Sequence, residues 1–163
     1  PRPSLLDPPA GRGESSSALG RARRYAGRQQ RLMQQCVMEP IIVRQKITQS
    51  DLIRYVQEGY YADARMAKLA VDVGRGVLAV GGEWHADAQE ALTQDGSQAA
   101  HVWGANFYPY NARGERLVFN SLINLKPIVP HRSMDITDRV LQDKIRSAVN
   151  NLLLDDNETI SGE

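Results

Sequence analysis

The sequence predicts a single α+β domain whose mainly antiparallel sheet of about five strands is built from two hairpins and combined with three helices. Two features of the apolar pattern lead to this fold class. Some stretches repeat their apolar residues with the period of a helix, whereas others alternate apolar and polar residues as strands do. Glycine-containing turns join neighbouring strand-like stretches, which makes those strands antiparallel. The expected order is β-α-β-β-α-β-β-α, with the helices on one face of the sheet.

The first half of the domain is expected to hold a strand, a helix and a hairpin. A short strand covers 41–44, and a helix follows Thr48, whose hydroxyl is suited to cap it with an acidic residue three positions on. Alternation over 69–73 and the apolar run 77–80 flank a glycine-rich turn and predict the first hairpin. Gly81 and the glycine after it then allow a bend or a close backbone approach.

The second half is expected to hold a helix, a longer hairpin and a final helix. The helix covers 85–94, where Asp87 begins a capping box. The strands of the hairpin cover 102–108 and 117–125, and the last helix begins at about Asp135. The buried stripe of that helix is expected to comprise Ile136, Val140, Leu141, Ile145, Ala148, Val149 and Leu152.

The register of the second hairpin follows from its apolar faces. A slip by one residue would turn one apolar face to solvent, so the faces must meet. Phe107 opposite Phe119 satisfies this condition and places Asn106 opposite Asn120 on the other side of the sheet.

Composition and charge divide the chain into three parts. Residues 1–37 are rich in Arg, Ser and Pro and read as a disordered basic tail, 38–154 form the domain, and 155–163 are an acidic, frayed end. The tail resembles a transit peptide or a basic arm for an anionic surface, or it does not belong to the functional domain, in which case Met38 is a natural start.

Several classes of partner and location are disfavoured. Outside the tail, 17 acidic residues outnumber 13 basic ones, which makes the domain a poor binder of nucleic acid. No apolar run reaches the roughly 18 residues that a membrane span needs. The single cysteine, Cys36, cannot form an internal disulfide, which suits a reducing compartment. We therefore expect a cytoplasmic protein without a membrane partner.

The rare residues between 81 and 127 occur in an order that resembles the motifs of a known family. The runs G-G-E-W-H-A-D, V-W-G-A-N-F-Y-P and F-N-S-L-I-N-L-K-P, followed by an amphipathic helix, resemble a family of small uncharacterised bacterial proteins that is common in cyanobacteria. The resemblance covers about residues 40–154. Because that family is itself a domain of unknown function, the resemblance implies a prokaryotic cytoplasmic setting but no chemistry.

One group of candidate residues could support metal binding or acid–base catalysis. If the strand from Val77 continues, Glu83, His85 and Asp87 point to one face, and Asp72 on the neighbouring strand could add a further oxygen ligand. Alternatively, the capping role explains Asp87, and Glu83 and His85 face solvent.

A second group is an amide face. Asn106, Asn120 and Asn124 are expected on one side of the second hairpin together with Tyr108. Asparagine is disfavoured in strands, so these residues predict either a polar pocket for a small ligand or the solvated side of the sheet.

A third group precedes the last helix. Arg132 and Ser133, with Lys126 and His131, could bind a phosphate or carboxylate at the start of that helix. Ser133 or Asp135 acting as an ordinary cap is the alternative.

The sequence favours a binding module over an enzyme. P-loop, GxGxxG, GxSxG and CxxC motifs are absent, so no cofactor is identified. The leading interpretation is a pocket for a small molecule or a partner. The alternatives are a metal-assisted or acid–base hydrolase using Glu83, His85 and Asp87, and an accessory interaction domain. A homodimer is also considered, because an open sheet has edges that need cover.

Overall fold

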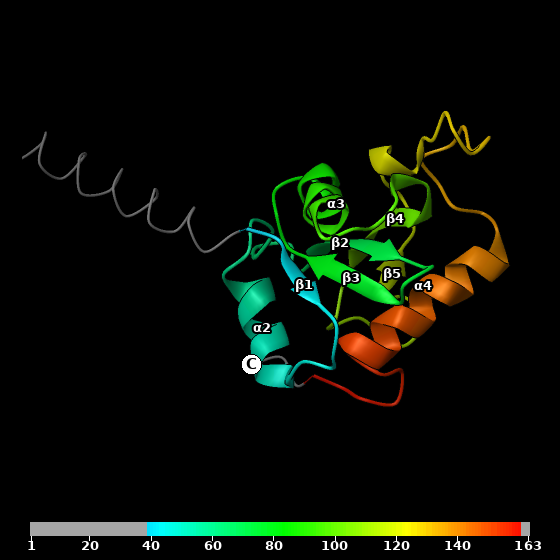
Figure 1. The fold of residues 1–163 in the computed structure, drawn as a ribbon. Coiled ribbons are helices and arrows are strands. Elements are labelled where there is room, and N and C mark those ends of the chain that lie inside the picture. Colours follow the sequence, from blue (N-terminus) through cyan, green and yellow to red (C-terminus); the bar gives the residue numbers. More distant parts are fainter. Residues whose placement is uncertain (1–38, 161–163) are drawn as a thin grey trace, which may run out of the picture. The chain divides into compact units, whose positions relative to one another are not determined.

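A computed structural model describes residues 39–160, and Figure 1 shows the arrangement of its helices and strands. Within these residues, three α-helices and five strands follow one another in the predicted order. The elements are β1 (Ile41–Val43), α2 (Gln49–Gln57), β2 (Ala67–Asp72), β3 (Val77–Val80), α3 (His85–Gln94), β4 (Val102–Phe107), β5 (Leu117–Val118) and α4 (Arg139–Leu152), with 3₁₀ turns at Ala99–His101 and Leu122–Asn124.

The five strands form one sheet in the order β1-β3-β2-β4-β5, and each neighbouring pair is antiparallel. β2 and β3 form the first predicted hairpin, and β4 and β5 form the second. The α+β fold class predicted from the sequence is therefore confirmed.

The helices cover both faces of the sheet, which corrects the expectation of a single covered face. One apolar cluster packs Leu69 and Val71 of β2 against α2 and α4. The other packs Ala70 of the same strand against Ala88 and Leu92 of α3. Figure 1 accordingly shows α3 on one side of the sheet and α2 and α4 on the other. Side chains of the central strands β2 and β4 alternate between the two faces of the sheet, and those on both faces are buried. Helices are therefore needed on both faces.

Two helix starts show how local hydrogen bonds set the element boundaries. Thr48 caps α2 as predicted, because its Oγ1 accepts the Asp51 N–H at 3.1 Å. α3 has the predicted bounds, but Asp87 lies inside its first turn and is not the cap. The Asp87 carboxylate accepts the N–H of Trp84, the residue at the cap position, at 2.8 Å. The assignment of Asp87 as the first residue of a capping box was therefore wrong.

The second hairpin is shorter than predicted, and its register differs by two residues. Phe107 pairs with Leu117, whereas Phe119 was expected there, and Asn106 pairs with Val118. An even shift keeps the same residues on the same face. β5 ends at Val118 because the chain beyond it pairs elsewhere, with the Ile136 N–H donating to the Phe119 carbonyl at 3.0 Å.

The last helix begins at Arg139, four residues later than predicted. Its cap is Asp138, whose Oδ1 accepts the Val140 N–H at 2.9 Å. Ile136 is buried as expected but precedes the helix, and Val140 is 65% exposed, which corrects its place in the buried stripe. Helix α4 buries the other predicted positions fully or in part: Leu141, Ile145, Ala148, Val149 and Leu152.

The C-terminal stretch was expected to fray from residue 155, but its described part packs on the domain. The buried Arg116 side chain donates to the carbonyls of Asp155 at 3.1 Å and Glu158 at 2.7 Å. Ile160 belongs to the cluster beneath α4. The predicted basic tail, 1–37, lies outside the described residues.

Candidate functional site

A cleft of about 460 Å³ lies on the α3 side of the sheet. Its floor comes from β2 and β4, where Lys68 and Asn106 stand directly opposite each other. The first turn of α3 and the segment 120–123 contribute to its walls. The lining residues are Lys68, Trp84, His85, Ala86, Asn106, Asn120, Ser121, Leu122, Ile123 and Met134. Three residues singled out from the sequence, His85, Asn106 and Asn120, are thus brought together.

Asn106 has an unused hydrogen-bond acceptor in this cleft. Its Nδ2 approaches the Asn120 carbonyl at 3.5 Å, a long hydrogen bond. Its Oδ1 is buried and has no partner within the described residues. A buried polar atom without a partner costs about 1–3 kcal/mol, so folded proteins usually satisfy it.

His85 stands beside Asn106 as a neutral imidazole. Burial lowers the pKa of His85 to about 4, and the charge of Lys68 acts in the same direction. The Ala105 carbonyl opposes that shift, and so does Asn106. A charged imidazolium would reach Asn106 Oδ1 as a donor, whereas the neutral ring, bonded to Ala105, leaves that oxygen without a partner. Because a carbonyl oxygen can only accept, His85 Nε2 carries the ring proton and donates a hydrogen bond to the Ala105 carbonyl at 3.1 Å. In the neutral ring, Nδ1 is then a hydrogen-bond acceptor.

Lys68 supplies the positive charge of the cleft. Its Nζ donates to the Glu83 carbonyl at 3.0 Å and lies 4.5 Å from the ring centre of Tyr61 and 5.0 Å from that of Trp84. An ammonium group has three donors, and the carbonyl uses one of them. The sequence did not identify Lys68 and Trp84 as candidate site residues. Lys68 could have been found from its position just before the strand predicted at 69–73, on the same face as the candidate Asp72.

The residues proposed for metal binding or acid–base chemistry do not converge. Gly81 and Gly82 have φ values of +102° and +83°, so the chain turns after β3 and does not continue as a strand. Glu83 is exposed, and the Asp87 carboxylate is used at the start of α3. Within residues 39–160, no three His, Cys, Asp or Glu side chains are placed to hold a metal ion. The expected one-face arrangement was therefore wrong.

Asp72 lies at the far end of β2 from Lys68, a separation of about 13 Å along an extended strand. Its side chain is fully buried, and Oδ1 accepts the N–H groups of Gly74 at 2.9 Å and Arg75 at 3.0 Å. Asp72 therefore shapes the turn between β2 and β3 and is not a lining residue of the cleft.

The predicted amide face is only partly a ligand face. Asn124 is fully buried: it accepts the Gly104 N–H at 2.8 Å, and its Nδ2 lies 3.1 Å from the Gly104 carbonyl and 2.9 Å from that of Met134. Asn120 lines the cleft, but its Nδ2 donates to the Asp135 carboxylate at 2.6 Å. Tyr108 is not among the lining residues.

The group before the last helix does not join the cleft either. Arg132 and Ser133 are exposed and do not line it. The Ser133 Oγ accepts the Asp135 N–H at 3.0 Å within that loop. Helix α4 starts six residues after Ser133 and has its own cap, so these side chains do not mark its N-terminus.

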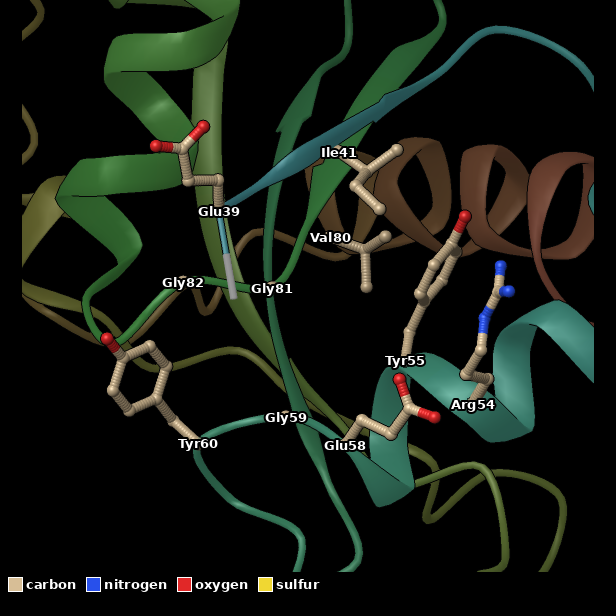
Figure 2. Close-up of a pocket in the computed structure, with 10 residues that line it drawn as sticks. All are labelled: Glu39, Ile41, Arg54, Tyr55, Glu58, Gly59, Tyr60, Val80, Gly81 and Gly82. Atoms are coloured by element: carbon tan, nitrogen blue, oxygen red, sulfur yellow. The ribbon is translucent and has the colours of Figure 1, made fainter. Parts of the chain in front are cut away.

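A second hollow, of about 210 Å³, lies between the start of β1, the end of α2 and the paired glycines. Figure 2 shows Ile41, Val80 and the ring of Tyr55 lining it beside Gly81. Arg54 also lines it, but its guanidinium pairs with Asp51 at 2.9 Å. This hollow contains neither of the buried polar atoms that lack partners in residues 39–160, and it is therefore a weaker candidate for specific binding.

One protein-family model matches nearly all of the described residues. The family described as "Protein of unknown function (DUF5674)" matches residues 41–152. The chain belongs to the DUF5674 family. All residues that line the cleft lie within the matched stretch of this DUF5674 domain. The match confirms the expectation of a domain of unknown function over about residues 40–154.

The other comparisons add no relative. Neither the curated proteins nor the solved structures contain a match to the chain. Among the residues described for the DUF5674 domain, 39–160, no helix has both the length and the apolar character that crossing a bilayer requires.

Proposed function

We propose that the DUF5674 domain binds a small organic molecule in the cleft above Lys68 and Asn106. The unpartnered, buried Oδ1 of Asn106 carries this proposal. It lies in a concave site whose size, about 460 Å³, is typical of small-molecule pockets. A setting in the cytoplasm of a bacterium, of the cyanobacterial type that the sequence resemblance implies, is part of the same proposal.

The lining groups restrict the chemistry of the ligand. Asn106 Oδ1 requires an N–H or O–H donor, whereas Lys68 Nζ offers donors to an acceptor or an anionic oxygen. Trp84, Leu122 and Met134 add apolar surface beside these groups. A small molecule with an apolar body and an edge that combines donor and acceptor, as in an amide or a hydroxy acid, fits this arrangement. The nearby charge of Lys68 disfavours a free metal ion.

A thermal-shift screen of the full chain against nucleotides, common metabolites and divalent metals tests the proposal. We expect an organic compound to raise the melting temperature, because a ligand that binds only the folded state stabilises it. Asn106→Ala should abolish that shift, whereas Asn151→Ala, a control on the exposed side of α4, should keep it. A shift that survives Asn106→Ala would place the ligand elsewhere. A response to divalent metals alone would favour the hydrolase alternative.

A specific observation also favours a second candidate, an interaction surface. Several large apolar side chains are exposed along one stretch of sequence: Val118, Leu122, Leu125, Ile128 and Met134. Large exposed apolar side chains are typical of contacts between proteins when they form a patch. We propose that a second copy of the chain covers these side chains, since Val118 lies on the edge strand β5 and an uncovered sheet edge favours pairing with another chain. The mass in solution tests this, since Ile128→Glu should convert a dimer to a monomer, and a monomeric wild-type chain would contradict it.

A further inference from the structure

Lys126 is a buried lysine without an acidic partner. Its side chain belongs to a residue that is only 7% exposed, and its Nζ donates to the Ala99 carbonyl at 2.6 Å. The same nitrogen lies 4.9 Å from the ring centre of Trp103. No aspartate or glutamate of residues 39–160 forms an ion pair with it. Buried lysines are rare unless they are paired, so the burial of Lys126 without an acidic partner needs an explanation.

A cavity of about 140 Å³ adjoins this lysine, and both Lys126 and Ala99 line it. Its other walls are mostly apolar: Gln89, Ala100, Ile123, Leu125, Pro127, Ile128 and Val129. Ile128 is 86% exposed and Leu125 is 43% exposed, so the lining reaches the surface of the domain. A small molecule can therefore approach Lys126 from solvent through apolar surroundings.

Burial makes Lys126 easier to deprotonate than an exposed lysine. Burial lowers the pKa of the Lys126 amine below its ordinary value. The Trp103 ring acts in the opposite direction, because its face attracts a cation. The hydrogen bond to Ala99 suits both forms, since a neutral amine still donates one N–H to a carbonyl. The neutral form, once the proton is lost, carries a nitrogen lone pair that can attack a carbonyl carbon.

We propose that Lys126 is a nucleophilic amine that forms an imine with a small, uncharged aldehyde or ketone held in the adjoining cavity. The small size follows from the volume of the cavity, about 140 Å³, which is open to solvent on the side of Ile128. The lack of charge follows from the lining, since Lys126 is the only charged residue in it. This inference is independent of the proposed ligand cleft, with which the cavity shares only Ile123.

The reaction balances without an oxidant or reductant. The neutral Nζ forms a bond to the carbonyl carbon, and the C=O π electrons move to oxygen. A proton passes from nitrogen to that oxygen through solvent water, which gives a carbinolamine. Loss of water then breaks the C–O bond and leaves the carbon–nitrogen double bond of the imine. Water in the reverse direction releases the carbonyl compound.

The chain contains four lysines, which makes a competitive labelling experiment possible: Lys46, Lys68, Lys126 and Lys144. The full, folded chain is treated with propanal and cyanoborohydride, which reduces an imine to a stable secondary amine. Peptide mapping by mass spectrometry then gives the labelling rate at each lysine. We expect Lys126 to react several-fold faster than the exposed Lys144, although burial alone would make it slower.

Two further arms separate cavity binding from general reactivity. A naphthaldehyde too large for the cavity should lose the preference for Lys126 while still labelling Lys144, and unfolding in urea should equalise the sites. The variant Ala100→Leu should slow labelling at Lys126 alone, because it fills the cavity. Labelling of Lys126 at or below the rate of Lys144, or equal preference for both aldehydes, would overturn the proposal.

Discussion

Asn106 and Asn124 were both expected on the amide face, but their side chains are satisfied differently. Asn124 pairs with the backbone of Gly104 and Met134, so Asn124→Ala should lower the free energy of unfolding by about 3 kcal/mol or more, because each orphaned buried group costs about 1–3 kcal/mol. Asn106→Ala should change it by less than about 1 kcal/mol, since Oδ1 has no partner to lose. Urea denaturation measures both values, and equal losses would contradict the distinction.

His85 links stability to pH. The pKa of His85 is about 4 in the folded chain and 6.5 in its ordinary state. Between these values the unfolded chain binds more protons, so stability should fall as pH decreases from 6.5 to 4, by up to roughly 3 kcal/mol from this residue. His85→Gln should flatten that part of the profile, whereas the exposed control His101→Gln should leave it unchanged. Unfolding free energies from urea titrations across this pH range give the comparison.

At the scale of elements, the sequence predicts the fold class and the order of helices and strands along the chain well, because both depend on local patterns. The period of the apolar residues identifies α2 and α4, and the cap of α2 at Thr48 is predicted from the residues that directly follow it. The end of β5 could not be predicted in this way. It depends on Asn124 reaching the backbone of Gly104, twenty residues away, and on Phe119 pairing with Ile136. Contacts of that separation leave no periodic signal.

The candidate site was predicted in the same partial way. Glu83, His85 and Asp87 are near one another in sequence and were expected to act together. The turn at Gly81 and the start of α3 instead place their side chains in different surroundings. The cleft instead joins His85 to Asn106 and Lys68 through the pairing of β2 with β4. That pairing connects strands that are not consecutive, and it was not fixed by any turn in the sequence.

Gly104 sets how closely the 3₁₀ turn after β5 approaches the sheet. A Cβ at this position would lie 2.5 Å from Ser121 Oγ and 2.6 Å from Ser121 Cβ. Gly104→Ala should therefore cost about 1–3 kcal/mol, the usual range for overpacking. Because Ser121 lines the cleft, the same change should weaken ligand binding. Adding Ser121→Gly should restore part of the stability. Thermal unfolding of the single and double variants tests the contact, and no restoration would argue against it.

At the scale of the whole molecule, one sheet serves two apolar clusters on opposite faces. Leu92 of α3 and Ile145 of α4 are both fully buried, each in a different cluster. Leu92→Ala and Ile145→Ala should each lower the free energy of unfolding by about 2–5 kcal/mol. Both clusters use side chains of β2 and β4, so loss of either should destabilise the same strands.

We therefore expect each variant to unfold in a single cooperative transition. Far-ultraviolet circular dichroism follows the helices. In a Trp84→Phe background, tryptophan fluorescence reports only the surroundings of Trp103, in the cluster shared with α4. The two probes should give coincident curves for both variants, which is the mark of two-state unfolding. If α3 instead formed a separately stable layer, Leu92→Ala would show loss of helix before the change in fluorescence. Coincidence would mean that the cleft beside the start of α3 shares the stability of the whole domain.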